Sequence, residues 1–157
     1  DGDARYWIAL GLASGIGHAT IKILGARYAS AEEIFQAPER ELASIEGVSA
    51  RAVEAIKSFS EWDKADAEVE KLEKSRFGFL PLSDTGYPPQ LYNIYNPPPY
   101  LFALGEMLPV DGSAIAIVGS RLPDKYGRTV TETLAGELAA LGITIVSGMA
   151  RGIDSIA

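Results

Sequence analysis

The sequence has 157 residues, with 14 Lys+Arg and 21 Asp+Glu, for a formal net charge of -7. Hydrophobic residues make up 47% and charged residues 22%, the balance of a globular chain rather than a disordered one. The acidic total argues against a protein that coats nucleic acid nonspecifically, because phosphate neutralisation needs clustered cations, but it leaves room for a small basic site. The chain has no cysteine and a single histidine, His18, which excludes disulfides and Cys-based zinc sites. We expect no metal centre and no Ser-His-Asp triad.

The sequence carries no membrane or secretion signal. No run approaches the roughly 20 apolar residues of a membrane span, and the N-terminus lacks the charged and apolar regions of a secretory signal. We therefore expect a cytoplasmic protein with no membrane partner. The chain lacks an initiator Met and stops a few residues after a motif that should begin a helix. We expect it to be a piece of a longer protein.

Composition changes about halfway along the chain. Residues 1–76 hold 10 basic and 14 acidic residues, whereas residues 77–157 hold only 4 basic and 7 acidic residues. The first part is rich in Ala, Glu and Lys with Pro38 as its one proline, and the second part holds the other eight prolines. We therefore expect a helical domain over residues 1–75 and an α/β domain over residues 76–157.

The apolar residues of the first part follow a helical spacing. Two stripes come early: Tyr6, Ala9, Leu10 and Ala13, then Ile21, Leu24 and Tyr28. A later helical pattern runs from Ser49 to about Lys74, and its apolar residues are Val53, Ile56, Phe59, Trp62, Val69 and Leu72. Ser30, followed by Glu32 and Glu33, is typical of an N-cap with acidic residues in the first helical turn. The first part is predicted to be a small all-α bundle.

A weak internal repeat lies within this helical part. Gly15-Ile16-Gly17 and Gly47-Val48-Ser49 lie 32 residues apart, each between two helical segments. The pattern resembles a helix-hairpin-helix pair, whose turn amides can face a DNA phosphate. A structural interpretation is simpler, because glycines permit the turns and apolar residues pack the hairpins. Basic residues are sparse there, only Lys22 and Arg51, which favours the structural interpretation.

The second part begins with β-forming segments. Residues 77–80 and 100–104 are predicted strands, joined by a proline-rich connector, residues 87–99, with Leu91 and Ile94 as its anchors. Residues 114–118 are apolar at every position, which suits a parallel strand buried on both faces.

A helix and another strand follow. The helical pattern covers residues 126–141, closes at Gly142, and leads to a predicted buried strand at residues 143–146. The apolar residues on one side of this helix are Val130, Leu134, Leu138 and Leu141. Strand, helix and strand at this spacing predict a βαβ unit of an open α/β sheet.

Two turns at the strand ends are candidate ligand sites, since open α/β sheets bind ligands beyond the carboxyl ends of their strands. Residues 119–121 follow the first parallel strand, and residues 147–154 follow the second. The basic residues after position 76 all fall in or just after these turns: Arg121, Lys125, Arg128 and Arg151. Glycines allow close backbone approach, hydroxyls and amides donate, and arginines bind phosphate in bidentate fashion. The turns therefore predict an anion site, with Asp154 as a helix cap or, less favoured, an orienting partner of Arg151.

Nucleotide-binding and catalytic signatures are missing. The sequence contains neither a phosphate-binding loop of the G-x-x-x-x-G-K-[ST] type nor a G-x-G-x-x-G after a strand. Asp124 and Asp154 do not stand out as a catalytic pair, so no catalytic residue is nominated. The residues alone predict a phosphate-bearing ligand that is not turned over.

The same residues resemble the DNA-processing protein A family (DprA, also called Smf). The matching motifs, in chain order, are Tyr87-Pro88 with Leu91 and Ile94, Pro98-Pro99-Tyr100-Leu101, Gly105, residues 115–121, Tyr126-Gly127, and residues 142–154. Many members carry a sterile-alpha-motif-like (SAM-like) or helix-hairpin-helix-like domain ahead of these motifs, which fits the helical part.

The resemblance implies an N-terminal SAM-like domain followed by an extended Rossmann-like open parallel-sheet domain that uses no nucleotide cofactor. It implies a sequence-independent single-stranded DNA-binding protein of natural transformation and recombination, which protects incoming strands and helps load the RecA recombinase without catalysis. The DNA-phosphate-binding residues it implies are Gly119, Ser120, Arg121, Ser147, Gly148, Arg151 and Gly152, with Lys125 and Tyr126 as additional contacts nearby. The family domain continues beyond Asp154, so the second domain is expected to be incomplete here, and the homodimer and RecA contacts belong to the complete protein.

Two other functions remain open. One is a nucleotide-binding Rossmann-like enzyme, a phosphoribohydrolase of the lysine-decarboxylase-like type. Such enzymes need a Pro-Gly-Gly-x-Gly-Thr loop, which these residues do not contain. The other is binding of duplex DNA by the two helical hairpins.

Overall fold

The structure is a computed structural model that describes residues 2–105 and 113–157. The chain divides into two compact units, residues 1–107 and 108–157. The first unit includes residues 77–105, which we expected in the second domain. The domain boundary near residue 75 stays a prediction.

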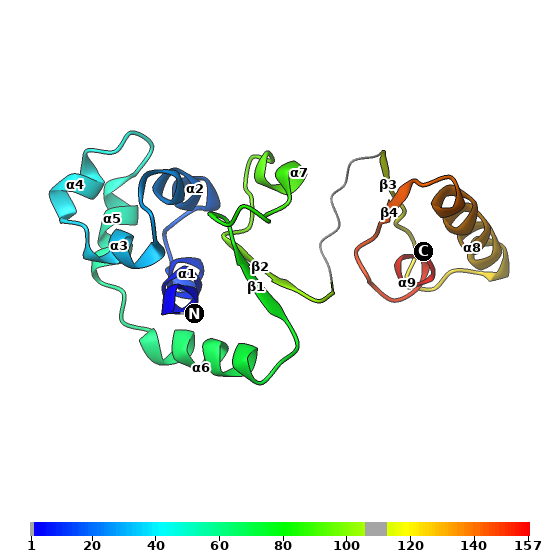
Figure 1. The fold of residues 1–157 in the computed structure, drawn as a ribbon, viewed down its shortest axis with the longest axis horizontal. Coiled ribbons are helices and arrows are strands. Elements are labelled where there is room, and N and C mark those ends of the chain that lie inside the picture. The colour runs from blue at the N-terminus through cyan, green and yellow to red at the C-terminus, as the bar shows by residue number, and fades with distance from the viewer. Residues whose placement is uncertain (1, 106–112) are drawn as a thin grey trace. The chain divides into compact units, whose positions relative to one another are not determined.

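The first unit combines helices with a two-stranded sheet (Figure 1). Its helices are α1 (Gly2–Leu12), α2 (His18–Arg27), α3 (Ala31–Gln36), α4 (Glu39–Ala43), α5 (Ala50–Lys57), α6 (Trp62–Glu73) and the single turn α7 (Pro89–Tyr92); its strands are β1 (Gly78–Pro81) and β2 (Tyr100–Ala103). Fully buried large side chains at its centre come from four of these helices: Trp7, Leu10, Ile21, Leu24, Ile34 and Leu42. The predicted cap is confirmed, because Ser30 Oγ accepts from the backbone N–H of Glu33 at 3.2 Å.

The two repeated turns pack against each other's helices. Gly15 and Gly47 have φ of +111° and +85°, a region that favours glycine. A Cβ at Gly15 would lie 3.1 Å from Arg51 Nε on α5, and one at Gly47 would lie 2.6 Å from Ile23 Cδ1 on α2. Turn geometry and close packing therefore explain these glycines, as the structural interpretation predicted.

The helical pattern from Ser49 to Lys74 is divided into α5 and α6. Ser58 ends α5, where its hydroxyl donates to the carbonyl of Glu54 at 2.7 Å, and α6 begins at Trp62. The Trp62 ring lies 5.0 Å from both Phe35 and Phe59, measured between ring centroids. Aromatic packing redirects the chain so that α6 runs along α1, which periodicity alone could not predict.

Strands β1 and β2 form an antiparallel pair in which Phe79 lies opposite Phe102. The proline-rich connector between them is held by Tyr87, which is buried and donates its hydroxyl to the carbonyl of Pro98 at 2.8 Å. The predicted anchor Leu91 is half-buried. The prediction that Ile94 is a second anchor is wrong, because this residue is 44% exposed. Burial of Tyr87 raises the pKa of its phenol.

The second unit is a βαβ unit, as predicted, with a further helical turn (Figure 1). Strand β3 (Ala114–Ala116) pairs in parallel with β4 (Thr144–Val146), α8 (Lys125–Ala140) connects them, and α9 (Ile153–Ile156) follows β4. The expected burial of the first strand on both faces is wrong, because all three residues of β3 are exposed. Two strands and one long helix do not enclose a sheet.

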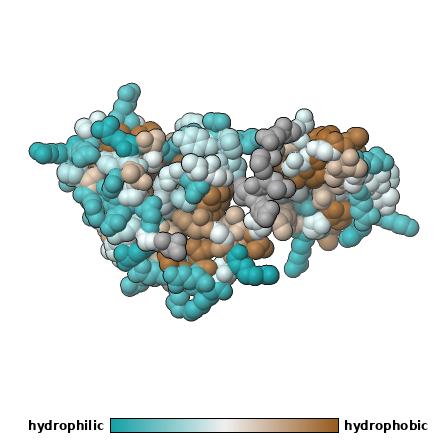
Figure 2. Space-filling view, viewed as in Figure 1, coloured by the Kyte–Doolittle hydropathy of each residue, from teal (hydrophilic) through white to brown (hydrophobic). Residues whose placement is uncertain are grey.

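The inward side of α8 also differs from the expectation. Thr131 and Ala135 are its buried residues, whereas Leu134 and Leu141 of the expected stripe are 48% and 77% exposed. Apolar surface is visible on this unit as on the first (Figure 2).

None of the helices in the described parts of the chain has both the length and the apolar composition that a membrane span requires.

Candidate anion-binding site

The two predicted turns meet in the second unit. Loop A (residues 117–122) follows β3, and loop B (residues 147–152) follows β4 and leads directly into α9. The backbone N–H of Ile153 donates to the carbonyl of Ser120 at 3.0 Å. The backbone N–H of Gly119 donates to Oδ1 of Asp154 at 3.1 Å. These hydrogen bonds hold loop A against the end of loop B and the start of α9.

The glycines of the site let the loops approach one another. Gly152 has φ +94°, and a Cβ there would lie 2.2 Å from the carbonyl oxygen of Ser120 and 2.7 Å from Cα of Arg121. A Cβ at Gly119 would lie 2.8 Å from Ile153 Cγ1, and one at Gly148 would lie 2.9 Å from Asp154 Oδ2. Real Cβ atoms do not make such contacts with backbone, so Gly152 in particular is required for this geometry.

The two serines of the site differ in what they offer a ligand. Ser147 Oγ lies 2.9 Å from the carbonyl oxygen of Ile117 and 3.1 Å from that of Asp154, so its single proton is used within the protein. Ser120 Oγ instead accepts from the backbone N–H of Leu122 at 3.1 Å, which leaves its O–H able to donate. Ser120 is also exposed, whereas Ser147 is half-buried. Ser120 is thus better placed as a donor to a ligand.

The expectation that Asp154 caps a helix is wrong. Gly152 is the N-cap of α9 and, as a glycine, has no side chain to accept from the first helical amides, whereas the Asp154 carboxylate reaches across to Gly119. Within the described residues Asp154 forms no ion pair with Arg151. Its role in joining the loops was missed, because the partner amide lies 35 positions earlier in the sequence. Only the sharing of one sheet edge by the two turns could have indicated it.

The cations of the site are exposed. Arg121, Lys125 and Arg151 are all exposed, and none of them forms an ion pair with any residue that the structure describes. Arg121 and Arg151 adjoin the point where Ser120 meets Gly152 and Ile153, so their side chains leave from neighbouring stretches of backbone. Two unpaired guanidinium groups held this way attract an anion.

The start of α8 adds to this arrangement. The helix begins at Lys125, and Asp124 caps it by accepting from the backbone N–H of Gly127 at 2.7 Å. Tyr126 lies in the first turn with a side chain that is 77% exposed, and Arg128 is exposed one turn later. The predicted additional contacts therefore lie at the positive end of a 16-residue helix.

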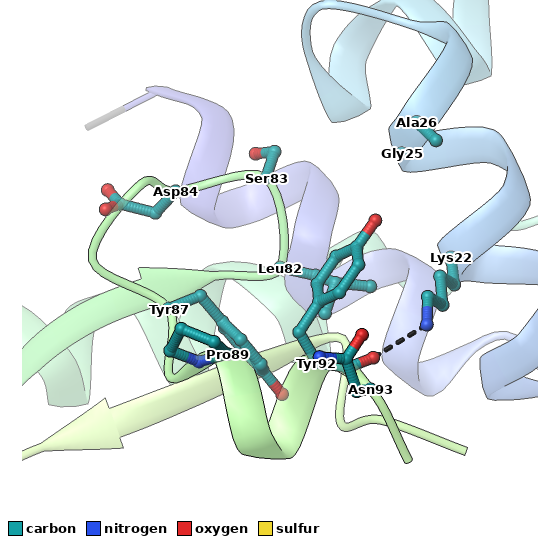
Figure 3. Close-up of a pocket in the computed structure, with 10 residues that line it drawn as sticks. All are labelled: Lys22, Gly25, Ala26, Leu82, Ser83, Asp84, Tyr87, Pro89, Tyr92 and Asn93. Carbon is teal, nitrogen blue, oxygen red and sulfur yellow. Dashed lines mark hydrogen bonds between the residues drawn. The ribbon is translucent and has the colours of Figure 1, made fainter. Parts of the chain in front are cut away.

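A separate pocket of about 370 Å³ lies in the first unit, between α2 and residues 82–93 (Figure 3). The ammonium of Lys22 donates to the carbonyl of Tyr92 at 2.6 Å and lies 4.3 Å from the centroid of the Tyr92 ring. Lys22 thus joins the helices to the connector between β1 and β2. None of the predicted site residues lines this pocket.

The described residues hold no group of three or more His, Asp or Glu side chains arranged to bind a metal ion.

The model of a known protein family, described as DNA recombination-mediator protein A, matches residues 78–157. The chain belongs to this family. The resemblance predicted from the motifs is thereby confirmed, and both loops lie within the matched residues.

Individual relatives agree with this assignment. The protein Smf of Synechocystis is 29% identical over 157 residues, 98% of this chain and 39% of the relative. The DNA processing protein DprA of Bacillus subtilis is 46% identical over 78 residues, 49% of this chain and 26% of the relative. The X-ray structure of DNA processing protein A (DprA) from Streptococcus pneumoniae matches 98% of this chain and 52% of its own chain, with a TM-score of 0.64 and 29% identity. The chain thus spans about two fifths of the length of the Synechocystis relative and about half of the solved Streptococcus chain.

Proposed function

We propose that this chain binds single-stranded DNA by its phosphates at loops A and B, independently of base sequence and without catalysis. Family membership supports a role in DNA recombination. The names of the Bacillus and Streptococcus relatives, DNA processing proteins, point to the same kind of substrate.

One observation supports the choice of Arg121 and Arg151. Both side chains are exposed and form no ion pair among the described residues. They extend from adjoining backbone at the end of a parallel sheet. Successive phosphates of a strand present the negative charge that such a pair binds, and Ser120 and the start of α8 supply further donors. A site of this size contacts two or three phosphates, which is compatible with an acidic chain.

The complete protein, in this proposal, is a cytoplasmic homodimer with a SAM-like domain and a Rossmann-like domain and with no cofactor. It acts in natural transformation and recombination, where it protects incoming single strands and helps load RecA. These roles extend beyond the segment described, since the relatives are more than twice as long as their match to this chain.

Binding of fluorescently labelled oligonucleotides tests the phosphate contacts. Arg121→Ala and Arg151→Ala should each weaken binding about tenfold, by a similar factor for single strands of different sequence, because phosphate contacts carry no sequence information. Arg40→Ala, which removes an exposed arginine from α4 in the first unit, is the matched control and should bind like the wild type. Unchanged affinity in both loop variants would refute the proposal.

A further inference from the structure

Loops A and B also carry two unusually exposed apolar side chains. Leu122 is 92% exposed and Met149 is 88% exposed, the highest values among the large apolar side chains that the structure describes. Leu122 lies next to Arg121, and Met149 lies two residues before Arg151. The proposed phosphate contacts do not use either side chain. Isolated apolar residues are common on surfaces, so exposure alone does not assign them a role.

Met149 has a second distinctive property. Its φ is +54°, and among the described residues it is the non-glycine residue with positive φ. A glycine would adopt this conformation without strain, and its neighbour Gly148 shows that the loop uses glycine elsewhere. The loop nevertheless places a long, flexible apolar side chain at a strained position and points it into solvent. Strained residues of this kind gather at ligand sites, where the side chain has a use that outweighs the strain.

We propose that Met149 and Leu122 contact the bases of the strand whose phosphates Arg121 and Arg151 bind, an inference that rests on the proposed function. In a single strand the bases are free to turn their apolar faces toward the protein, whereas in a duplex those faces are stacked inside the helix. The thioether of methionine and the isobutyl group of leucine adapt to any base, so these contacts carry no sequence preference. They give the site its preference for single over double strands.

Three DNA probes of equal length separate base contacts from phosphate contacts: a thymidine oligonucleotide, an abasic oligonucleotide with the same number of phosphates, and a duplex. The wild type should bind the thymidine strand about tenfold more tightly than the abasic strand or the duplex. Met149→Asn and Leu122→Gln should each weaken binding to the thymidine strand about threefold to fivefold and leave binding to the other two probes unchanged. Asparagine tolerates positive φ, so this variant changes the side chain and keeps the loop conformation.

Two further variants serve as controls. Met149→Leu keeps an apolar side chain and should bind the thymidine strand like the wild type. Leu141→Gln makes the same exchange as Leu122→Gln at a 77% exposed residue at the other end of α8, and should have no effect. Equal binding of the thymidine strand by the wild type, Met149→Asn and Leu122→Gln would overturn the base contacts, while weaker binding by Arg121→Ala would leave the proposed function standing. Failure of the wild type to bind any of the probes would overturn both.

Discussion

The backbone N–H of Gly119 and the carboxylate of Asp154 form a hydrogen bond of 3.1 Å that joins the end of one parallel strand to the helix after the next. A hydrogen bond to a charged acceptor is stronger than one between neutral groups. Together with the bond from Ile153 to the carbonyl of Ser120, it fixes the loop that carries Arg121 against the loop that carries Arg151. The aspartate therefore holds together the two loops that carry these arginines.

Removal of the Asp154 carboxylate should loosen this junction. In Asp154→Ala, the amide of Gly119 loses its acceptor, and we expect its hydrogen exchange to accelerate about tenfold, corresponding to the loss of roughly 1.5 kcal/mol. Asp154→Asn keeps an oxygen acceptor and should show an intermediate rate. Exchange at Gly119 that is the same in all three proteins would contradict the role assigned to Asp154.

Gly152 should be intolerant of a side chain. Gly152→Ala places a Cβ against the carbonyl of Ser120 at a φ of +94°, so we expect it to destabilise the second unit by about 2 kcal/mol or more. The control is Gly136→Ala on α8, where a Cβ would meet no atom within 4 Å and should stabilise the helix by up to about 1 kcal/mol.

Hydrogen exchange of the α8 amides is the suitable readout for this pair of variants. Tryptophan fluorescence would report on the wrong unit, because Trp7 and Trp62 both lie in the first. If the α8 amides exchanged as slowly in Gly152→Ala as in Gly136→Ala, the close contact between the loops would not exist in solution.

Local rules predicted much of this structure. The cap at Ser30, the glycine turns at Gly15 and Gly47, and the strand–helix–strand unit after residue 113 all follow from short-range geometry, and all are present. The cap and the turns depend on residues within a few positions, and the parallel pairing of β3 with β4 follows from the order strand, helix, strand.

The errors arise where contacts between residues far apart in the sequence determine the structure. Trp62, the first residue of α6, packs against Phe35, and Asp154 finds its partner in the other loop. Ile94 and Leu134 fit an apolar pattern, yet no described neighbour covers them fully. The candidate cations were found because they cluster in the sequence, whereas Leu122 and Met149 give no sequence signal until their exposure and backbone conformation are known.

The stability of the first unit should depend on pH through Asp66. The guanidinium of Arg5 donates to both carboxylate oxygens, with Nη2 3.0 Å from Oδ2, and this hydrogen bonding lowers the pKa of Asp66 below its ordinary 3.8. A lowered carboxyl pKa stabilises the folded protein at pH values above the unfolded pKa, and the contribution is lost as the pH falls through the folded pKa.

Carbon-detected NMR titration of the Asp66 carboxyl checks this prediction. We expect its midpoint below 3.8 in the wild type and a return toward 3.8 in Arg5→Gln, with no change in Arg40→Gln. A wild-type midpoint at or above 3.8 would show that the ion pair does not persist in solution.

The salt dependence of single-stranded DNA binding tests the proposed phosphate contacts most directly. Each phosphate contacted on a single strand contributes about -0.7 to the slope of log K against log salt concentration, so two or three contacts predict a slope of about -2. Arg121→Ala should make the slope shallower by about 0.7, and Arg40→Ala should leave it unchanged. A wild-type slope near zero, or a slope that Arg121→Ala does not alter, would contradict binding of DNA phosphates at these two loops.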